Sequence, residues 1–257
     1  LFLENIIKTE NEIPDLYSGD IRKVVFEING NYTGIFKESA GQKIINLPKI
    51  WNCHSGIEFN IEVKNLPSLK NKYITFGCFN NSSKISDVVI ETWSQILLKV
   101  DNSKLMIKAP SEDAEIAQKN ILKKFINLNI DASKIIFSPR MKDRKDHYKM
   151  YNEIDISLDT FPYTGVTTFI ESIWMGVPVL TLKGSNFVSR CGESLNLNLG
   201  MQEFIASDKN DYINKAIAIS KDKKKLSLIR NSLREKALSS PIFDMKSFGQ
   251  DFSDLLN

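Results

Sequence analysis

The feature that most constrains this chain is a regular alternation of short apolar runs and longer segments of helical periodicity, which starts at Tyr73. Strands of about five residues that alternate with helices of about 10–15 residues are typical of a parallel α/β sheet. Strands covered on both faces are mostly apolar, as these runs are. The sequence therefore predicts a parallel α/β sheet with helices on both faces. The expected strands are 73–79, 105–107, 135–137, 154–158 and 177–181, and the expected helices are 85–100, 114–128, 142–153, 166–175 and 188–198.

Two flanking regions lack this alternation. Residues 206–257 show only helical patterns, at about 209–221, 223–237 and 245–256. Residues 1–69 are irregular, with one strand-like run at 23–28 before a turn signal at 29–31, and an extended segment at 47–51. We predict three parts: a segment at 1–69 that does not form a complete domain on its own; the sheet domain at 70–205; and helices that pack on this domain at 206–257.

Charge and cysteine content argue against several classes of function. The 34 basic and 31 acidic residues leave a net charge of +3, too small an excess to favour a nucleic-acid or membrane partner. No apolar run approaches the roughly 20 residues that span a bilayer. The cysteines, Cys53, Cys78 and Cys191, are too widely spaced for a disulfide framework or a zinc site. We therefore expect free, buried thiols in the reducing cytoplasm.

Ligands of parallel sheets bind at the carboxyl ends of the strands, and three polar clusters follow expected strands. The first cluster, after 73–79, contains Asn81 and Lys84, an amide and a cation that can meet a phosphate. It matches neither a phosphate-binding loop nor a dinucleotide fingerprint. On spacing alone, an ordinary polar loop is the better interpretation.

The second cluster follows the fourth expected strand, where Pro162 and Gly165 form a turn before Thr167 and Thr168. A helix that starts there offers unpaired backbone amides and the positive end of its dipole to an anion. Glu171 lies one turn further along the same face, where a carboxylate suits the hydroxyls of a ribose. An N-capping threonine followed by a surface glutamate explains the pattern equally well.

The third cluster follows the third expected strand and places Arg144 and His147 on one helix face. An imidazole can stack on a base, and an arginine can reach a base carbonyl or a ribose. A lone histidine is more often structural, but the position at the ligand edge favours a functional one.

Motifs for other chemistry are missing. The chain has no Ser-His-Asp order, no HExxH and no DxD-like pair for a metal-bound diphosphate, so we expect no metal site. A helix N-terminus and cations would then have to neutralise a diphosphate, and the first two clusters can supply them.

Together, these segments resemble the catalytic C-terminal half of the O-linked N-acetylglucosamine transferase family, which is family 41 and includes SPINDLY-type plant proteins and bacterial relatives. The likeness runs from about Leu47 to Phe252. Its signature stretches are Phe76–Asn81 with Lys84, Ile136–Pro139, Leu158–Thr168, Trp174–Val179 and Ser189-Arg190. The resemblance implies a Rossmann-like parallel sheet with helices on both faces, as in the C-terminal lobe of a GT-B glycosyltransferase. It also implies that residues 1–69 are an inter-lobe segment or the remnant of an N-terminal lobe. It also implies a UDP-sugar donor, most simply UDP-N-acetylglucosamine, with no metal and no prosthetic group.

The resemblance also assigns seven residues to the donor. By position, Asn81, Lys84, Thr167 and Thr168 would face the diphosphate, Glu171 would hold the ribose, and Arg144 and His147 would bracket the uracil. Lys84 would stabilise the leaving UDP, and no general base is assigned.

Three residues depart from the animal members of the family. Glu171 replaces an Asp, Val166 replaces a His, and Met150 replaces an Arg. The family's N-terminal catalytic lobe and its tetratricopeptide repeats are expected upstream, as partners of this chain. The first expected function is inverting transfer of N-acetylglucosamine to Ser or Thr hydroxyls of a protein or peptide. Glucosylation of asparagine or transfer from another UDP-hexose remains open as an alternative, as does a non-catalytic UDP-binding module.

Overall fold

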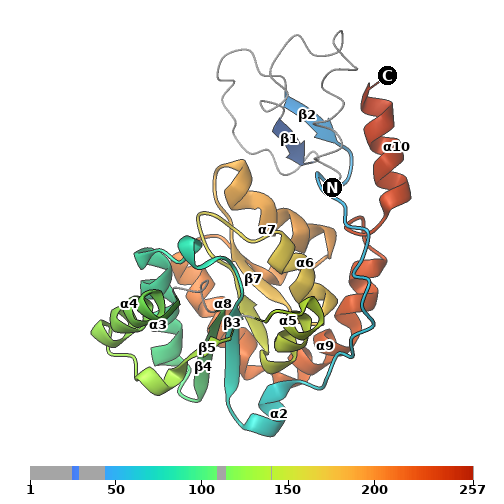
Figure 1. Ribbon diagram of the computed structural model, residues 1–257. Helices are drawn as coiled ribbons and strands as arrows, with labels where there is room; N and C mark the ends of the chain where they lie inside the picture. Colours follow the sequence, from blue (N-terminus) through green and yellow to red (C-terminus); the bar gives the residue numbers. More distant parts are fainter. Residues whose placement is uncertain (1–24, 29–43, 109–113, 140, 257) are drawn as a thin grey trace.

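The computed structural model describes residues 25–28, 44–108, 114–139 and 141–256 (Figure 1). Its centre is a parallel six-stranded sheet in the order β5-β4-β3-β6-β7-β8. The strands are β3 (Ile74–Cys78), β4 (Ser103–Lys108), β5 (Ile135–Ser138), β6 (Ile156–Leu158), β7 (Val179–Leu182) and β8 (Ile205–Ala206). Counted from β3, this order is 3-2-1-4-5-6, that of a dinucleotide-binding Rossmann sheet. The predicted α/β class and parallel sheet are confirmed.

Five of the six strands lie where the apolar runs predict them. Every residue of β3 is buried, as expected for a central strand covered on both faces. The sixth strand, β8, was not predicted because it is only two residues long and carries no periodic pattern. It pairs with the end of β7 through Thr181 and Leu182, and extends the sheet at its edge.

Helices cover both faces of the sheet (Figure 1). Helices α3 (Asp87–Lys99), α4 (Ala114–Asn127) and α8 (Lys209–Lys221) contribute to one core cluster with β3 to β8. The other face carries α5 (Arg144–Lys149), α6 (Thr167–Trp174), α7 (Phe187–Asn198) and α9 (Lys223–Leu238). The helix expected at 142–153 is split, because α5 tightens into the 3₁₀ turn η5 (Met150–Glu153).

The described part of the N-terminal region packs along the lobe. Strands β1 (Val25–Ile28) and β2 (Ile44–Leu47) form a parallel pair. The segment that follows buries Ile50, Ile61 and Leu66, one in each of three core clusters, and leads into α2 (Pro67–Asn71). The last helix, α10 (Met245–Leu256), contacts β2. Residues 23–24 of the expected strand and the turn at 29–31 lie outside the described residues.

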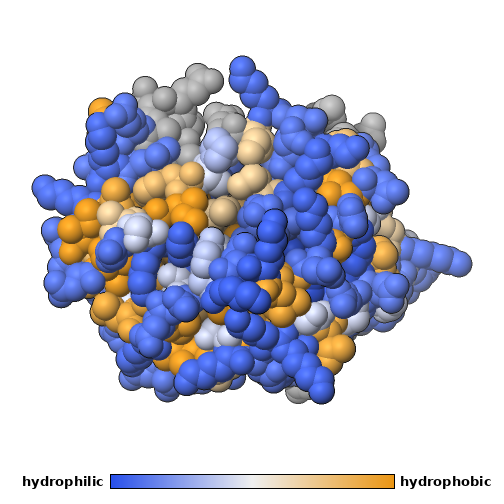
Figure 2. Space-filling view, turned by 90° about the horizontal axis from the view of Figure 1, so that it is seen from below, coloured by the Kyte–Doolittle hydropathy of each residue, from blue (hydrophilic) through white to orange (hydrophobic). Residues whose placement is uncertain are grey.

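The amino ends of the strands lie opposite the edge where ligands of parallel sheets bind. The amino ends lie at α2, because β3 follows that helix directly. Figure 2 shows this end of the molecule, where hydrophilic side chains predominate and hydrophobic ones are interspersed.

Within the described ranges, no helix combines the length and the apolar character needed to cross a membrane. All three cysteines are free, and Cys78 and Cys191 are buried.

Candidate functional site

The candidate site lies where β3 and β6 are neighbours. Their pairing, with Phe76 opposite Ile156, is the point at which the strand order reverses. At such a switch point the loops leave in opposite directions and open a crevice at the carboxyl edge of the sheet. The loop after β3 carries Lys84, and the loop after β6 leads into α6. The fold therefore brings together the first two clusters predicted from the sequence.

Asp159 organises the loop after β6. Its carboxylate is buried and accepts hydrogen bonds from the Asn80 side chain (2.9 Å), the backbone amides of Thr160 (2.9 Å) and Gly165 (2.8 Å), and the Thr181 hydroxyl (2.9 Å). Burial raises the pKa of Asp159 to about 6, and these hydrogen bonds oppose a larger rise. The sequence interpretation missed this role, since it depends on contacts between distant segments.

Asn80 connects that loop to α6. Its amide nitrogen donates to Asp159 and to Thr160 Oγ1 (2.8 Å), and its amide oxygen accepts from the hydroxyl of Thr168. Gly165 is required beside this contact, because a Cβ there would clash with Asn80 and Thr168. The Thr168 hydroxyl proton is thus committed within the protein, and only its backbone amide stays unpaired for an anion.

The start of α6 is uncapped. Val166 occupies the N-cap position, and no side chain caps the helix. Thr167 is the first helical residue and is exposed. The backbone amides of residues 167–169 donate no hydrogen bond to the described part of the chain, so they remain available to a ligand. The alternative of an N-capping Thr167 does not agree with this geometry.

Lys84 reaches the same turn from the loop after β3. Its Nζ donates to the carbonyl oxygen of Thr164 at 3.0 Å and lies 3.7 Å from the centroid of the Tyr163 ring. It forms no ion pair with a carboxylate of the described residues, so its charge is not neutralised. Asn81 is exposed, and its side-chain oxygen accepts from Ser83 N (3.0 Å) as the cap of a 3₁₀ turn.

Glu171 is held between two other elements of the fold. Its Oε2 is 3.0 Å from His147 Nε2 in α5 and accepts from the Tyr151 hydroxyl at 2.9 Å. Because the carboxylate is an acceptor, Nε2 of His147 carries the proton of this bond. The side chain of Glu171 is only 13% exposed, so it is not the solvated surface residue of the alternative interpretation.

Arg144 lies at the start of α5 and is exposed. Its guanidinium carbon is 5.8 Å from the centroid of the Phe59 ring. Burial and the charge of Glu171 raise the pKa of Tyr148, and Arg144 opposes this rise. Arg144 and Glu171 therefore act on one tyrosine from nearby positions, although they form no ion pair with each other.

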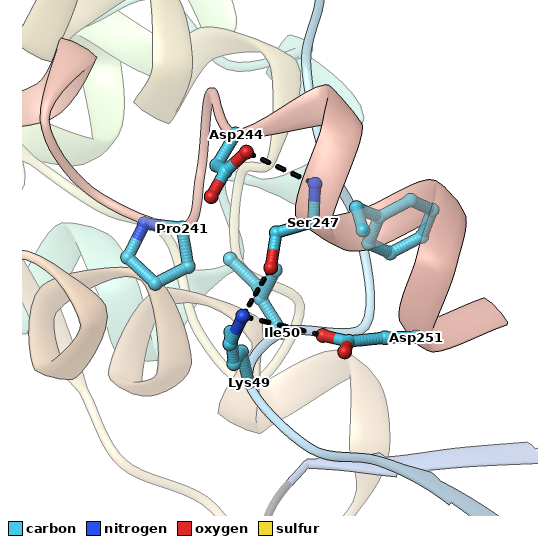
Figure 3. A pocket seen from close by; sticks show the side chains of 7 residues that line it. Lys49, Ile50, Pro241, Asp244, Ser247 and Asp251 are labelled. Atoms are coloured by element: carbon cyan, nitrogen blue, oxygen red, sulfur yellow. Dashed lines mark hydrogen bonds and ion pairs between the residues drawn. The ribbon is translucent and has the colours of Figure 1, made fainter. Parts of the chain in front are cut away.

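Other parts of the described chain give weaker indications of a binding site. None of these residues form a group of three or more His, Cys, Asp or Glu side chains that could hold a metal ion. A small pocket lies between α10 and the segment after β2, with Lys49 at its centre near Ser247 and Asp251 (Figure 3). Lys49 and Asp251 form an ion pair at 3.8 Å, so the lysine of that pocket already has a partner within the protein.

The fold and the loops at its switch point place this chain among the Rossmann-like α/β lobes. The chain matches the model of Glycosyl transferase family 41 over residues 55–252, and it belongs to that family. It is 35% identical over 215 residues to a probable UDP-N-acetylglucosamine–peptide N-acetylglucosaminyltransferase SPINDLY of Eustoma exaltatum subsp. russellianum. That match covers 84% of this chain and 23% of the plant protein, so the chain spans less than a quarter of its relative.

Solved structures agree with this assignment. An O-GlcNAc transferase of Thermobaculum terrenum superimposes with a TM-score of 0.73 at 28% identity, over 83% of this chain and 40% of that one. A crystal structure of TarM superimposes with a TM-score of 0.60 at 13% identity, over 99% of this chain and 46% of that one, and shows the fold alone. The resemblance to the family and the Rossmann-like lobe of GT-B type are confirmed.

Proposed function

We propose that this chain is the donor-binding lobe of an inverting, metal-independent protein glycosyltransferase. It would bind a UDP-sugar, most simply UDP-N-acetylglucosamine, for transfer to Ser or Thr hydroxyls. The observation that carries the proposal is the meeting of Lys84 with the unpaired amides of α6 at the switch point, with Glu171 one turn along the helix. Membership of family 41, and the names of the plant and bacterial relatives, support the same substrate class.

The chemistry that this lobe contributes is leaving-group stabilisation. An acceptor hydroxyl attacks the anomeric carbon from the side opposite to UDP. The new carbon–oxygen bond forms as the bond to the β-phosphate oxygen breaks, and the configuration inverts. Negative charge grows on the departing diphosphate, where Lys84 and the amides of Thr167 and Thr168 stabilise the transition state more than the bound donor.

The remaining assigned residues orient the nucleotide. Glu171 accepts from the ribose hydroxyls, Arg144 and His147 lie on either side of the uracil, and Asn81 lies at the outer edge of the diphosphate. We assign no general base within the described residues. A second catalytic lobe, as in the longer relatives, would supply the base and the acceptor contacts.

Calorimetric titration of the chain with UDP, UMP and GDP tests the proposal. UDP should bind more tightly than UMP, because UMP lacks the β-phosphate that Lys84 and α6 would contact. GDP should bind more weakly than UDP, because a purine does not fit between residues assigned to uracil. Failure to bind UDP, or equal binding of GDP, would contradict the proposed donor.

Catalysis needs a separate measurement. The chain alone should release no UDP from UDP-N-acetylglucosamine in the presence of a Ser/Thr peptide, since the opposing lobe is expected to be required. Robust peptide transfer by the chain alone would overturn the division of roles between lobes. If a protein that joins this chain to a second catalytic lobe also binds UDP without transferring sugar, the non-catalytic binding module becomes the better interpretation.

A further inference from the structure

The carboxylate of Glu171 is anchored at one oxygen and open at the other. Oε2 accepts from both Tyr151 (2.9 Å) and His147 (3.0 Å). The Tyr148 hydroxyl also interacts with this carboxylate, but Oε1 accepts no hydrogen bond of standard geometry from the described residues. It is not among their buried polar atoms without a partner, so it reaches solvent. This asymmetry leaves one oxygen for the protein and one for a ligand.

The side chain of Tyr151 is held rigidly, so its hydroxyl donates from a fixed position. It lies in the 3₁₀ turn η5 with 1% of its surface exposed, and its ring packs edge-on against Phe79 with centroids 4.8 Å apart. Its hydroxyl is also 3.3 Å from the carbonyl oxygen of Thr168, in the first turn of α6. Burial and the charge of Glu171 raise the pKa of Tyr151 well above its ordinary value, so the hydroxyl keeps its proton.

The reach of the side chain matters for this contact. Aspartate at position 171 would be shorter by one carbon–carbon bond of about 1.5 Å, and could not keep the hydroxyl of Tyr151 at hydrogen-bond distance. The longer acid and the buried tyrosine therefore form a matched pair. His147 alone would leave the carboxylate free to rotate about a single contact.

We propose that Tyr151 is a positioning residue, whose hydroxyl fixes Glu171 so that Oε1 faces the ribose of the bound nucleotide. This inference rests on the proposed function, since it takes the ribose contact of Glu171 from it. Tyr151 itself touches no ligand in this arrangement and acts only through Glu171.

The test is Tyr151→Phe, which removes one hydroxyl and keeps the ring. UDP and 2′,3′-dideoxy-UDP are titrated by calorimetry into the wild type and the variant. The wild type should prefer UDP by about tenfold, the usual effect of a hydrogen bond to a charged group. The variant should lose most of that preference while binding dideoxy-UDP as the wild type does.

Ser172→Ala is the matched control. It also removes a buried hydroxyl, that of Ser172 in α6, which donates to the carbonyl oxygen of Val177 at 3.0 Å. Thermal unfolding should show lower stability for both variants. Only Tyr151→Phe should change the ratio of the two affinities, because a structural defect weakens both ligands alike.

A second comparison tests the inference even if the variant Tyr151→Phe alone does not fold. The double variant Tyr151→Phe, Glu171→Gln removes both the donor and the charge it pairs with, which is less damaging than removing one. It should bind UDP within twofold of Glu171→Gln, because Tyr151 acts through that carboxylate. A further large loss in the double variant would overturn the inference.

The outcomes separate the two proposals. If the wild type prefers UDP over dideoxy-UDP and Tyr151→Phe keeps the preference, the positioning role is wrong and the donor site stands. If the wild type binds both nucleotides equally, the ribose contact and the role of Tyr151 both fail. If it binds no UDP, the proposed function fails with them.

Discussion

Replacing Lys84 with Ala tests the phosphate-facing half of the site most directly. The side chain is half-buried, its Nζ donates to the carbonyl of Thr164 at 3.0 Å, and it lies over the ring of Tyr163 at 3.7 Å. These contacts hold the ammonium at the turn before α6 without neutralising it. We expect Lys84→Ala to weaken UDP and to leave uridine nearly unchanged.

The size of the effect follows from these contacts. A charge-assisted hydrogen bond contributes about 1.5–3 kcal/mol. To bind a phosphate, Nζ gives up part of its interaction with Thr164 and Tyr163, so the lower end of that range applies. About 1.5 kcal/mol corresponds to roughly a tenfold loss of UDP affinity. Because the charge interaction is screened, the loss should shrink as salt rises.

Calorimetric titration of UDP and uridine into both proteins measures this difference. Lys104→Ala is the matched control, since Lys104 also lies over a tyrosine ring, that of Tyr73 at 4.8 Å, near the amino end of β4. It should leave both affinities unchanged. Equal losses of UDP and uridine in Lys84→Ala, or an equal effect of Lys104→Ala, would refute the assignment of Lys84 to the diphosphate.

Three further predictions concern metal dependence, pH and stability. Adding EDTA should change UDP affinity by less than twofold, because Lys84 and the α6 amides supply the positive charge; a large loss measured by calorimetry would reveal a metal. The folded pKa of Asp159, about 6 against 3.8, means that the folded state binds this proton more tightly, so its contribution to stability falls as pH rises. The unfolding free energy of wild type relative to Asp159→Asn should therefore drop by about 2 kcal/mol between pH 4 and 7, and a flat difference in urea melts would contradict this. Arg230→Met should destabilise the fold by about 3 kcal/mol or more in urea melts, because the buried guanidinium donates to the carbonyls of Lys64, Tyr151 and Ile154; a change below about 1 kcal/mol would refute it.

The sheet could be predicted because its strands carry a local signal. The runs around Phe76, Ile107 and Leu158 are mostly apolar, which is the composition expected of central parallel strands that helices cover on both faces. Strand β8 carries no such signal, since Ile205 and Ala206 pair only because β7 presents an open edge. The split of the helix at Met150 was not predicted either, although it is local: the amide of Met150 bonds to the carbonyls of His147 and Tyr148, three and two residues earlier, and the chain then turns toward β6.

The site could be predicted in part for the same reason. Lys84, Thr167 and Glu171 were found by their positions just after strands, where parallel sheets hold ligands. The residues that hold them in place were not found. Asn80 meets Asp159 across 79 positions of sequence, and Tyr151 meets Glu171 from a turn in a different crossover. Neither pair has a spacing that a single sequence reveals.

The start of α6 shows why local rules mislead at such a site. Helices α3, α5, α7, α8 and α9 each begin with a side chain that caps the backbone, contributed by Ser86, Asp143, Asn186, Asp208 and Asp222. Such a cap contributes about 1 kcal/mol. At α6 the corresponding residue is Val166, which has no oxygen to offer. A capping oxygen there would pair with the amides that the proposed diphosphate needs, and an Asp would add a repelling charge. An anion site at this helix therefore requires the loss of the stability that a cap would contribute. It also requires that Lys84, which lies beside the helix, forms no ion pair with a carboxylate.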